Sequence, residues 1–112
     1  MFYNQITGQA VEPTDWQLQL KPGDYYLIDR PTIMMGDETH TGPNCYGHII
    51  GNTPDPDEPA YPEGFFLVRA YSQWCPKGEL GLFCIVEATR QLTEAEFEAF
   101  RAQGWPAEMS NE

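Results

Sequence analysis

The stretch between Phe65 and Trp105 constrains the fold of this chain more than any other. It begins with two runs of aromatic and aliphatic residues, Phe65–Ser72 and Leu80–Thr89, which are separated by a Pro-Lys-Gly sequence. Short apolar runs bounded by turn residues are typical of strands, so we expect an antiparallel hairpin. Both faces of these strands carry apolar residues, which predicts a central position in a curled sheet with a helix on one side.

A capped helix is expected directly after the hairpin, over residues 94–103. Thr93 and Glu96 form the T-x-x-E pattern of a capping box. Gly104 suits the C-terminal cap, and the proline two residues later prevents continuation. Trp105 is expected to fold back beneath the helix, so this segment is interpreted as structural packing.

The remaining segments complete the predicted architecture. Trp16–Leu20 alternates apolar and polar residues like a half-buried strand, and Tyr25–Ile28 also has the pattern of a strand. Residues 31–63 contain six prolines and four glycines, which predicts a long loop that could include a short strand at Tyr46–Ile50. Residues 107–112 are expected to form a frayed acidic tail. We therefore predict one α+β domain: a small, strongly bent antiparallel sheet or partly open barrel of about four to six strands, with one C-terminal α-helix packed on it.

The charge of the chain excludes some partners and permits others. It has 17 acidic and 6 basic residues, for a formal net charge of −11. This negative charge would repel nucleic-acid phosphates and an anionic membrane surface, so direct contact with either is not expected. A protein partner, or a second copy of the chain, is permitted; acidity that serves solubility alone is the alternative.

The cysteines and the N-terminal residues indicate the compartment. The chain has three cysteines without the spacing of a disulfide framework, and its N-terminus lacks the basic and apolar regions of a signal peptide. No apolar window approaches the length of a membrane span. A cytoplasmic location with reduced thiols is therefore expected.

Three residues of the predicted loop could bind a metal ion. His40, Cys45 and His48 lie close in sequence, and the last two form a C-x-x-H pair that could supply two zinc ligands. No second ligand pair supports a structural zinc site, so we expect no cofactor, with zinc as the alternative. The same residues could form a cysteine nucleophile with a histidine base; Asp37 or Asn44 could orient the base, although nothing in the spacing requires it.

Five residues are candidates for an interaction surface. Asp55, Asp57 and Glu58 stand among prolines in the predicted loop, where a solvated turn is the alternative interpretation. Arg69 interrupts an apolar strand and could bind an anion, pair with a carboxylate such as Glu87, or extend to the sheet edge. Trp74 could line an exposed aromatic patch with Trp16 and Tyr71, since aromatic residues are enriched at interface centres; packing in the core is the alternative.

The sequence contains no phosphate-binding glycine loop and no G-x-S-x-G nucleophile elbow. We therefore expect a small, acidic, non-enzymatic interaction or accessory protein, of the kind encoded by phages or mobile elements, that binds a protein partner or itself. Two alternatives remain open. One is a metal- or small-molecule-dependent activity centred on His40, Cys45 and His48, and the other is an acidic DNA mimic that inhibits a nucleic-acid-binding protein.

Overall fold

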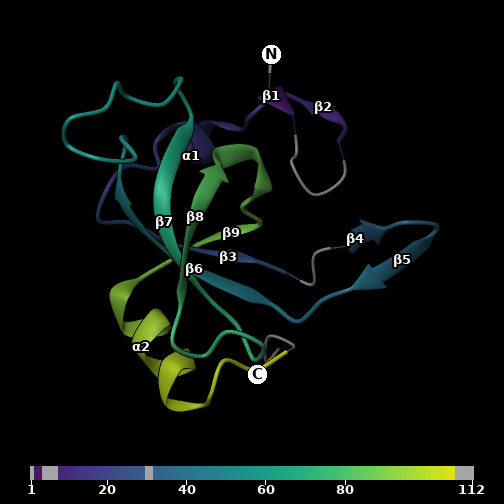
Figure 1. The fold of residues 1–112 in the computed structure, drawn as a ribbon. Coiled ribbons are helices and arrows are strands. Elements are labelled where there is room, and N and C mark those ends of the chain that lie inside the picture. Colours follow the sequence, from purple (N-terminus) through teal and green to yellow (C-terminus); the bar gives the residue numbers. More distant parts are fainter. Residues whose placement is uncertain (1, 4–7, 30–31, 108–112) are drawn as a thin grey trace.

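A five-stranded antiparallel sheet with the order β8-β7-β6-β3-β9 forms the centre of the molecule (Figure 1). The structure is a computed structural model that describes residues 2–3, 8–29 and 32–107. The sheet strands are β3 Tyr25–Ile28, β6 Cys45–Gly51, β7 Phe65–Tyr71, β8 Glu79–Cys84 and β9 Arg90–Leu92. Two further pairs are β1 Phe2–Tyr3 with β2 Ala10–Val11, and β4 Thr32–Met35 with β5 Glu38–Thr41. The helices are α1 Asp15–Leu18, the 3-10 helix η1 Ile85–Glu87 and α2 Glu94–Ala102.

The small α+β fold with an antiparallel sheet and a C-terminal helix confirms the coarser prediction. In the described part of the chain the sheet is not closed, because β8 and β9 are its two edges, so a barrel is not confirmed. None of the helices that the structure describes is long and apolar enough to cross a membrane.

The predicted hairpin is formed by β7 and β8, with Phe65 opposite Cys84 and Ala70 opposite Glu79. Its connection ends in a β-turn in which the Gly78 N–H donates to the Cys75 carbonyl over 3.1 Å. Gly78 has a φ of 85°, a conformation that favours glycine. The second predicted run is too long, because β8 ends at Cys84 and the chain continues as η1.

Helix α2 begins at the predicted cap. The Glu96 N–H donates to the Thr93 hydroxyl over 3.1 Å, and the Thr93 N–H donates to the Glu96 carboxylate over 3.0 Å. The carboxylate also forms a 2.7 Å ion pair with Arg90 of β9. These contacts attach the start of the helix to the edge of the sheet.

Helix α2 ends in a Schellman motif, as the glycine predicts. The Gly104 N–H donates to the Arg101 carbonyl and the Trp105 N–H to the Phe100 carbonyl, each over 3.0 Å. The chain reverses here, and the Trp105 side chain is buried beneath the helix, as expected.

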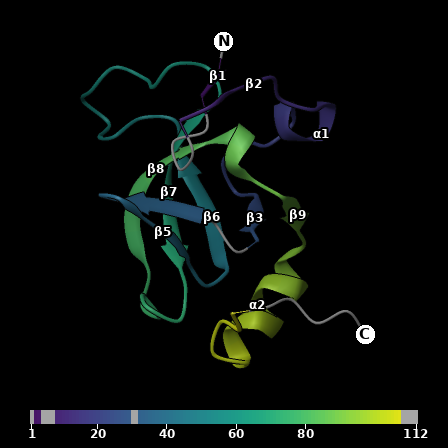
Figure 2. The same ribbon diagram turned by 90° about the vertical axis from the view of Figure 1, so that its right-hand side faces the viewer.

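Helix α2 packs on one side of the sheet, which we call the helix face (Figure 2). Strand alternation and register assign to this face Tyr25, Leu27, Tyr46, His48, Leu67, Arg69, Tyr71, Leu80 and Leu82. Phe97 and Trp105 are the helix-side centre of the contact, with ring centroids 5.1 Å apart.

The other side of the sheet we call the pocket face. It carries Tyr26, Ile28, Cys45, Gly47, Ile49, Val68, Ala70, Glu79 and Phe83. At one end the Tyr26 ring lies across Gly47 and stacks on Phe83 with centroids 3.9 Å apart. Helix α1 covers this end, where buried Gln17 donates from Nε2 to the Ala88 carbonyl over 2.9 Å.

The prediction of a strand at Trp16–Leu20 is wrong, because α1 occupies Asp15–Leu18. Thr14 and Gln17 form a capping box, and the Gln17 side chain accepts from the Thr14 N–H over 2.9 Å. An alternating pattern of five residues is compatible with both structures, and here the local cap favours the helix.

Residues 31–63 do not form one long loop. Within this segment lie β4 and β5, which project from the sheet as a hairpin, and β6, which is its central strand (Figure 1). Irregular structure is confined mainly to residues 52–64. The prolines and glycines of this segment reflect turns between short strands and not one long loop. Of the predicted tail, residues 108–112 lie outside the described residues.

Replacement of Gly47 is expected to destabilise the fold. A Cβ atom at this position would come within 1.9 Å of the Tyr26 ring, so Gly47→Ala should lower the free energy of unfolding by about 1–3 kcal/mol or more. Gly51→Ala in the same strand is the matched control, because a Cβ atom there meets nothing within 4 Å. Denaturant unfolding measures both; equal stabilities of the two variants would contradict the close packing.

Candidate functional site

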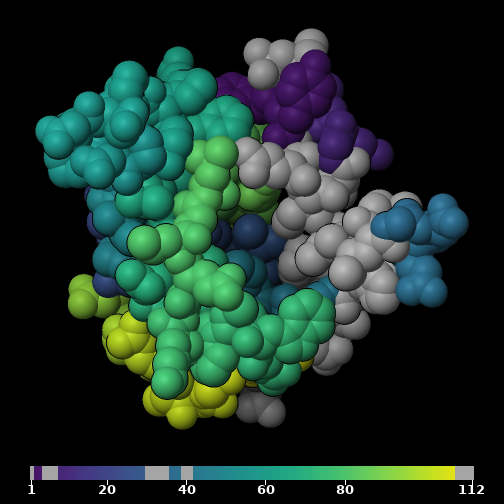
Figure 3. All heavy atoms as spheres, in the orientation of Figure 1, coloured from purple at the N-terminus to yellow at the C-terminus, as the bar shows by residue number. Residues whose placement is uncertain are grey.

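The pocket face has an unfilled region at the end that α1 does not cover. It forms a cavity of about 260 Å³. The described lining residues are Ile28, Gly42, Pro43, Cys45, Ala70, Tyr71, Ser72, Trp74, Cys75 and Glu79. In the space-filling view this side of the molecule is hollowed beside β8, with blue atoms of earlier strands at the bottom (Figure 3). The cavity is therefore a candidate binding site.

The cavity arises from the sizes of the side chains on the pocket face. The end near Phe83 is filled by the aromatic stack with Tyr26, whereas Cys45 and Ala70 supply only small side chains at the other end. Helix α1 and η1 pack against the filled end. No large side chain among the described residues fills the remaining volume above Ile28.

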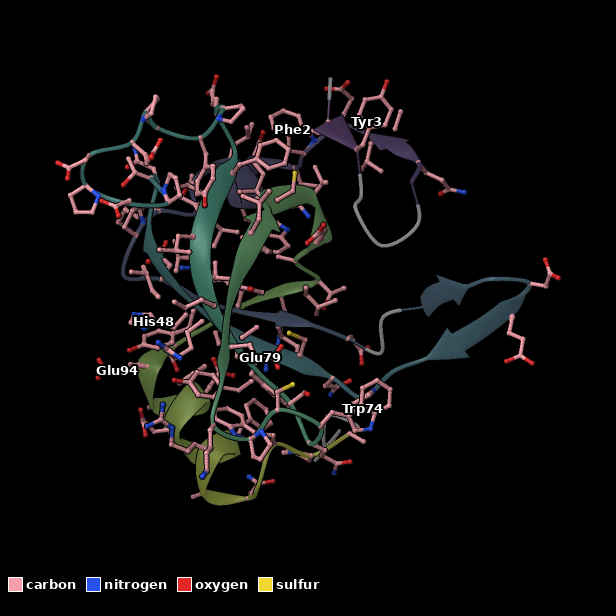
Figure 4. All side chains as sticks on the ribbon, in the orientation of Figure 1. Phe2, Tyr3, His48, Trp74, Glu79 and Glu94 are labelled. Atoms are coloured by element: carbon pink, nitrogen blue, oxygen red, sulfur yellow. The ribbon has the colours of Figure 1, made fainter. Side chains whose placement is uncertain are left out.

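A polar network orients the turn at the rim of the cavity. The Ser72 hydroxyl accepts hydrogen bonds from the backbone N–H groups of Trp74 and Cys75, over 3.1 and 3.2 Å. The Trp74 side chain projects from this turn and is 68% exposed (Figure 4). Glu79, the first residue of β8, places its carboxylate at the same cavity and forms a hydrogen bond with the Cys75 thiol.

The two cavity thiols are poorly suited to nucleophilic catalysis. Burial raises the pKa of the Cys45 thiol to about 11, and the nearby Glu87 and Cys75 add to this effect. The hydrogen bond with Glu79, together with burial, raises the pKa of the Cys75 thiol. A reactive cysteine normally has a lowered pKa, because the thiolate is the nucleophile.

The structure separates two of the three predicted metal ligands, Cys45 and His48. Cys45 and His48 are three residues apart in β6, so their side chains point to opposite faces, and His48 stacks on Tyr25 with centroids 4.5 Å apart. They cannot bind the same ion. His40 lies opposite Ile33 in the β4–β5 hairpin, and its side chain is outside the described part of the structure. No cluster of three or more potential metal ligands occurs among the described side chains.

The predicted interaction residues fall on separate surfaces. Asp55, Asp57 and Glu58 lie in the exposed turns of residues 52–64, where Asp55 accepts hydrogen bonds from the other two backbone N–H groups. This segment is far from Trp74 in the molecule (Figures 1 and 4). Arg69 is on the helix face between Leu80 and His48, and Glu87 is buried in η1 and not on the neighbouring strand.

No protein-family model matches this chain. Comparison with curated proteins and with solved structures likewise gives no significant match.

Sequence reasoning missed Ser72 and Glu79, which surround the cavity with Trp74. It also missed the open edge strand with its exposed leucines, Leu80 and Leu82. The sequence already predicted a strand of the hairpin at these residues. Because side chains alternate along a strand, Glu79 and Gly81 could have been assigned to one face and the two leucines to the other.

Thiol reactivity tests the arrangement of the cavity. At pH 8 the thiolate fraction of Cys45 should be about 100-fold smaller than that of an ordinary cysteine, and its alkylation correspondingly slow. Glu79→Gln removes the charged partner of Cys75 and should lower the pKa of that thiol, which accelerates its alkylation and leaves Cys45 unchanged. Site-resolved mass spectrometry over a pH series measures both rates; fast labelling of Cys45 at pH 8 would contradict its raised pKa.

Proposed function

We propose that this chain is a non-enzymatic interaction protein that binds an extended segment of a protein partner along the open edge of β8. The observation that carries the proposal is the combination, on this one strand, of outward-facing peptide groups and exposed leucines. Extended peptides commonly bind by adding a strand to a sheet edge, with affinity from backbone hydrogen bonds and specificity from alternate side chains.

The register identifies the peptide groups that face outward. The Ile85 N–H donates to the Gly64 carbonyl over 3.0 Å, which continues the β7–β8 ladder by one pair. Hydrogen-bonded pairs alternate along an antiparallel ladder, so Gly81 and Phe83 direct their peptide groups toward β7. The peptide groups of Leu80 and Leu82 consequently point to the open edge and can form four hydrogen bonds with an added strand.

The side chains of the same two residues favour an apolar partner segment. Leu80 is 58% exposed and Leu82 is 45% exposed, and both are on the helix face. An added strand would place its alternate side chains beside them. Natural edge strands are often protected by lysine, proline or a bulge, and β8 contains no lysine or proline.

Charge favours a different protein over a second copy of the chain. Two copies, each with a net charge of −11, would repel one another at low ionic strength. A neutral or basic partner would instead be attracted. We therefore assign the edge to a partner segment that has apolar residues at alternate positions and basic residues near them.

Selection from a random peptide library displayed on phage tests this function. Enriched peptides should alternate apolar and other residues, and their binding should protect the backbone amides of Leu80 and Leu82 from hydrogen exchange. Leu82→Pro removes one outward N–H without removing a bond to β7, so it should weaken binding at least tenfold in calorimetric titrations.

A second variant, Leu80→Lys, places a charge among the exposed leucines of the edge. Its matched control is Leu18→Lys, because Leu18 is 53% exposed and lies in α1. Leu80→Lys should lose peptide binding and Leu18→Lys should retain it. Peptides that bind all variants equally, or no enrichment at all, would reject the proposal. A dimer in sedimentation that Leu82→Pro dissociates would instead assign the edge to a second copy.

A further inference from the structure

The cavity beside the turn that connects β7 and β8 has a mainly apolar bottom and wall. Ile28, Cys45 and Ala70 form an apolar bottom, and Pro43 adds an apolar wall. At about 260 Å³ the cavity is slightly smaller than the roughly 300–1,000 Å³ of pockets for drug-sized ligands. Its volume therefore suits a single aromatic ring or a short alkyl chain.

One charged side chain and one exposed aromatic ring at the cavity indicate the charge that a ligand should carry. Glu79 is the one charged side chain among the described lining residues, and it lies beside the apolar surface. Trp74 offers an indole ring at the same cavity, and such rings attract cations through their electron-rich faces. The net charge of −11 would in addition repel an anionic ligand.

We propose that this cavity binds an organic cation, namely a primary ammonium group carried on a small apolar body. The apolar body contacts Ile28, Cys45 and Ala70, and the ammonium group forms an ion pair with Glu79 beside the Trp74 ring. Attraction to the carboxylate is strengthened by the neighbouring apolar side chains, which exclude part of the water.

Two sources can supply this chemistry. One is a free amine; the other is a lysine side chain of a partner segment, since Glu79 is also the first residue of the β8 edge. Only the second source depends on the proposed function. The cavity can therefore be tested without any peptide bound to the edge.

Three probes of similar shape and different charge test the proposal on the full chain: 2-phenylethylamine, 2-phenylethanol and 3-phenylpropionate. Binding is followed in nitrogen-15 NMR spectra through the Trp74 indole N–H and the backbone amides of Cys45 and Ala70. The amine should bind at least tenfold more tightly than the alcohol, and the carboxylate should bind most weakly. High salt should weaken binding of the amine and leave the alcohol unchanged.

Glu79→Gln should remove the advantage of the amine over the alcohol. Glu58→Gln changes the net charge by the same amount at an exposed position outside the cavity lining, so it should preserve that advantage. Equal affinity of the amine and the alcohol for the unmodified protein would overturn the proposal. Absence of binding by all three probes, or spectral changes confined to residues outside the cavity, would also overturn it.

A lysine mimic separates the two sources. Nα-acetyl-lysine methylamide that displaces 2-phenylethylamine from the cavity supports a partner side chain as a natural occupant. If it fails to displace the amine, the site is assigned to free amines. If the unmodified protein binds the amine but no edge peptide is enriched from the library, the proposed function is rejected and this inference is retained.

Discussion

The fold depends on the packing of aromatic rings between α2 and the helix face. Phe97 contacts Tyr25 and Tyr71 with centroid distances of 4.5 and 5.6 Å, and Trp105 lies 4.8 Å from Tyr71. Each such pair contributes about 0.5–1.5 kcal/mol beyond the burial of apolar area. The Trp105 indole N–H also donates to the Pro76 carbonyl over 3.1 Å, so one side chain connects the end of the helix to the turn of the β7–β8 hairpin.

Among the described residues, the same arrangement leaves part of the helix face exposed, at Leu80 and Leu82 of β8. A helix of nine residues is about 13 Å long and about 10 Å wide, whereas the two seven-residue strands at the centre of the sheet are about 23 Å long and five strands span about 19 Å. The uncovered surfaces meet at β8, because its consecutive residues Glu79 and Leu80 point to opposite faces.

Local signals were sufficient for the C-terminal half of the fold. The caps of α2 depend on residues within a few positions of each other, and Pro-Lys-Gly specifies a turn from its own backbone preferences, so both could be predicted. The N-terminal half depends on pairing between distant strands. A short strand at Tyr46–Ile50 could be expected from the sequence, but the place of Cys45–Gly51 at the sheet centre follows only from its contacts with β3 and β7.

The candidate site also combines features that the sequence determined with features that depend on the tertiary structure. The sequence alone determined the charge of −11, the hairpin that contains β8 and the presence of a tryptophan between its two strands. Only the tertiary structure decided that Cys45 faces a cavity with Glu79 while His48 stacks against Tyr25 on the other side. The physical reason is that side chains alternate along a strand, so neighbours in sequence are separated by the sheet and residues from distant strands share one face.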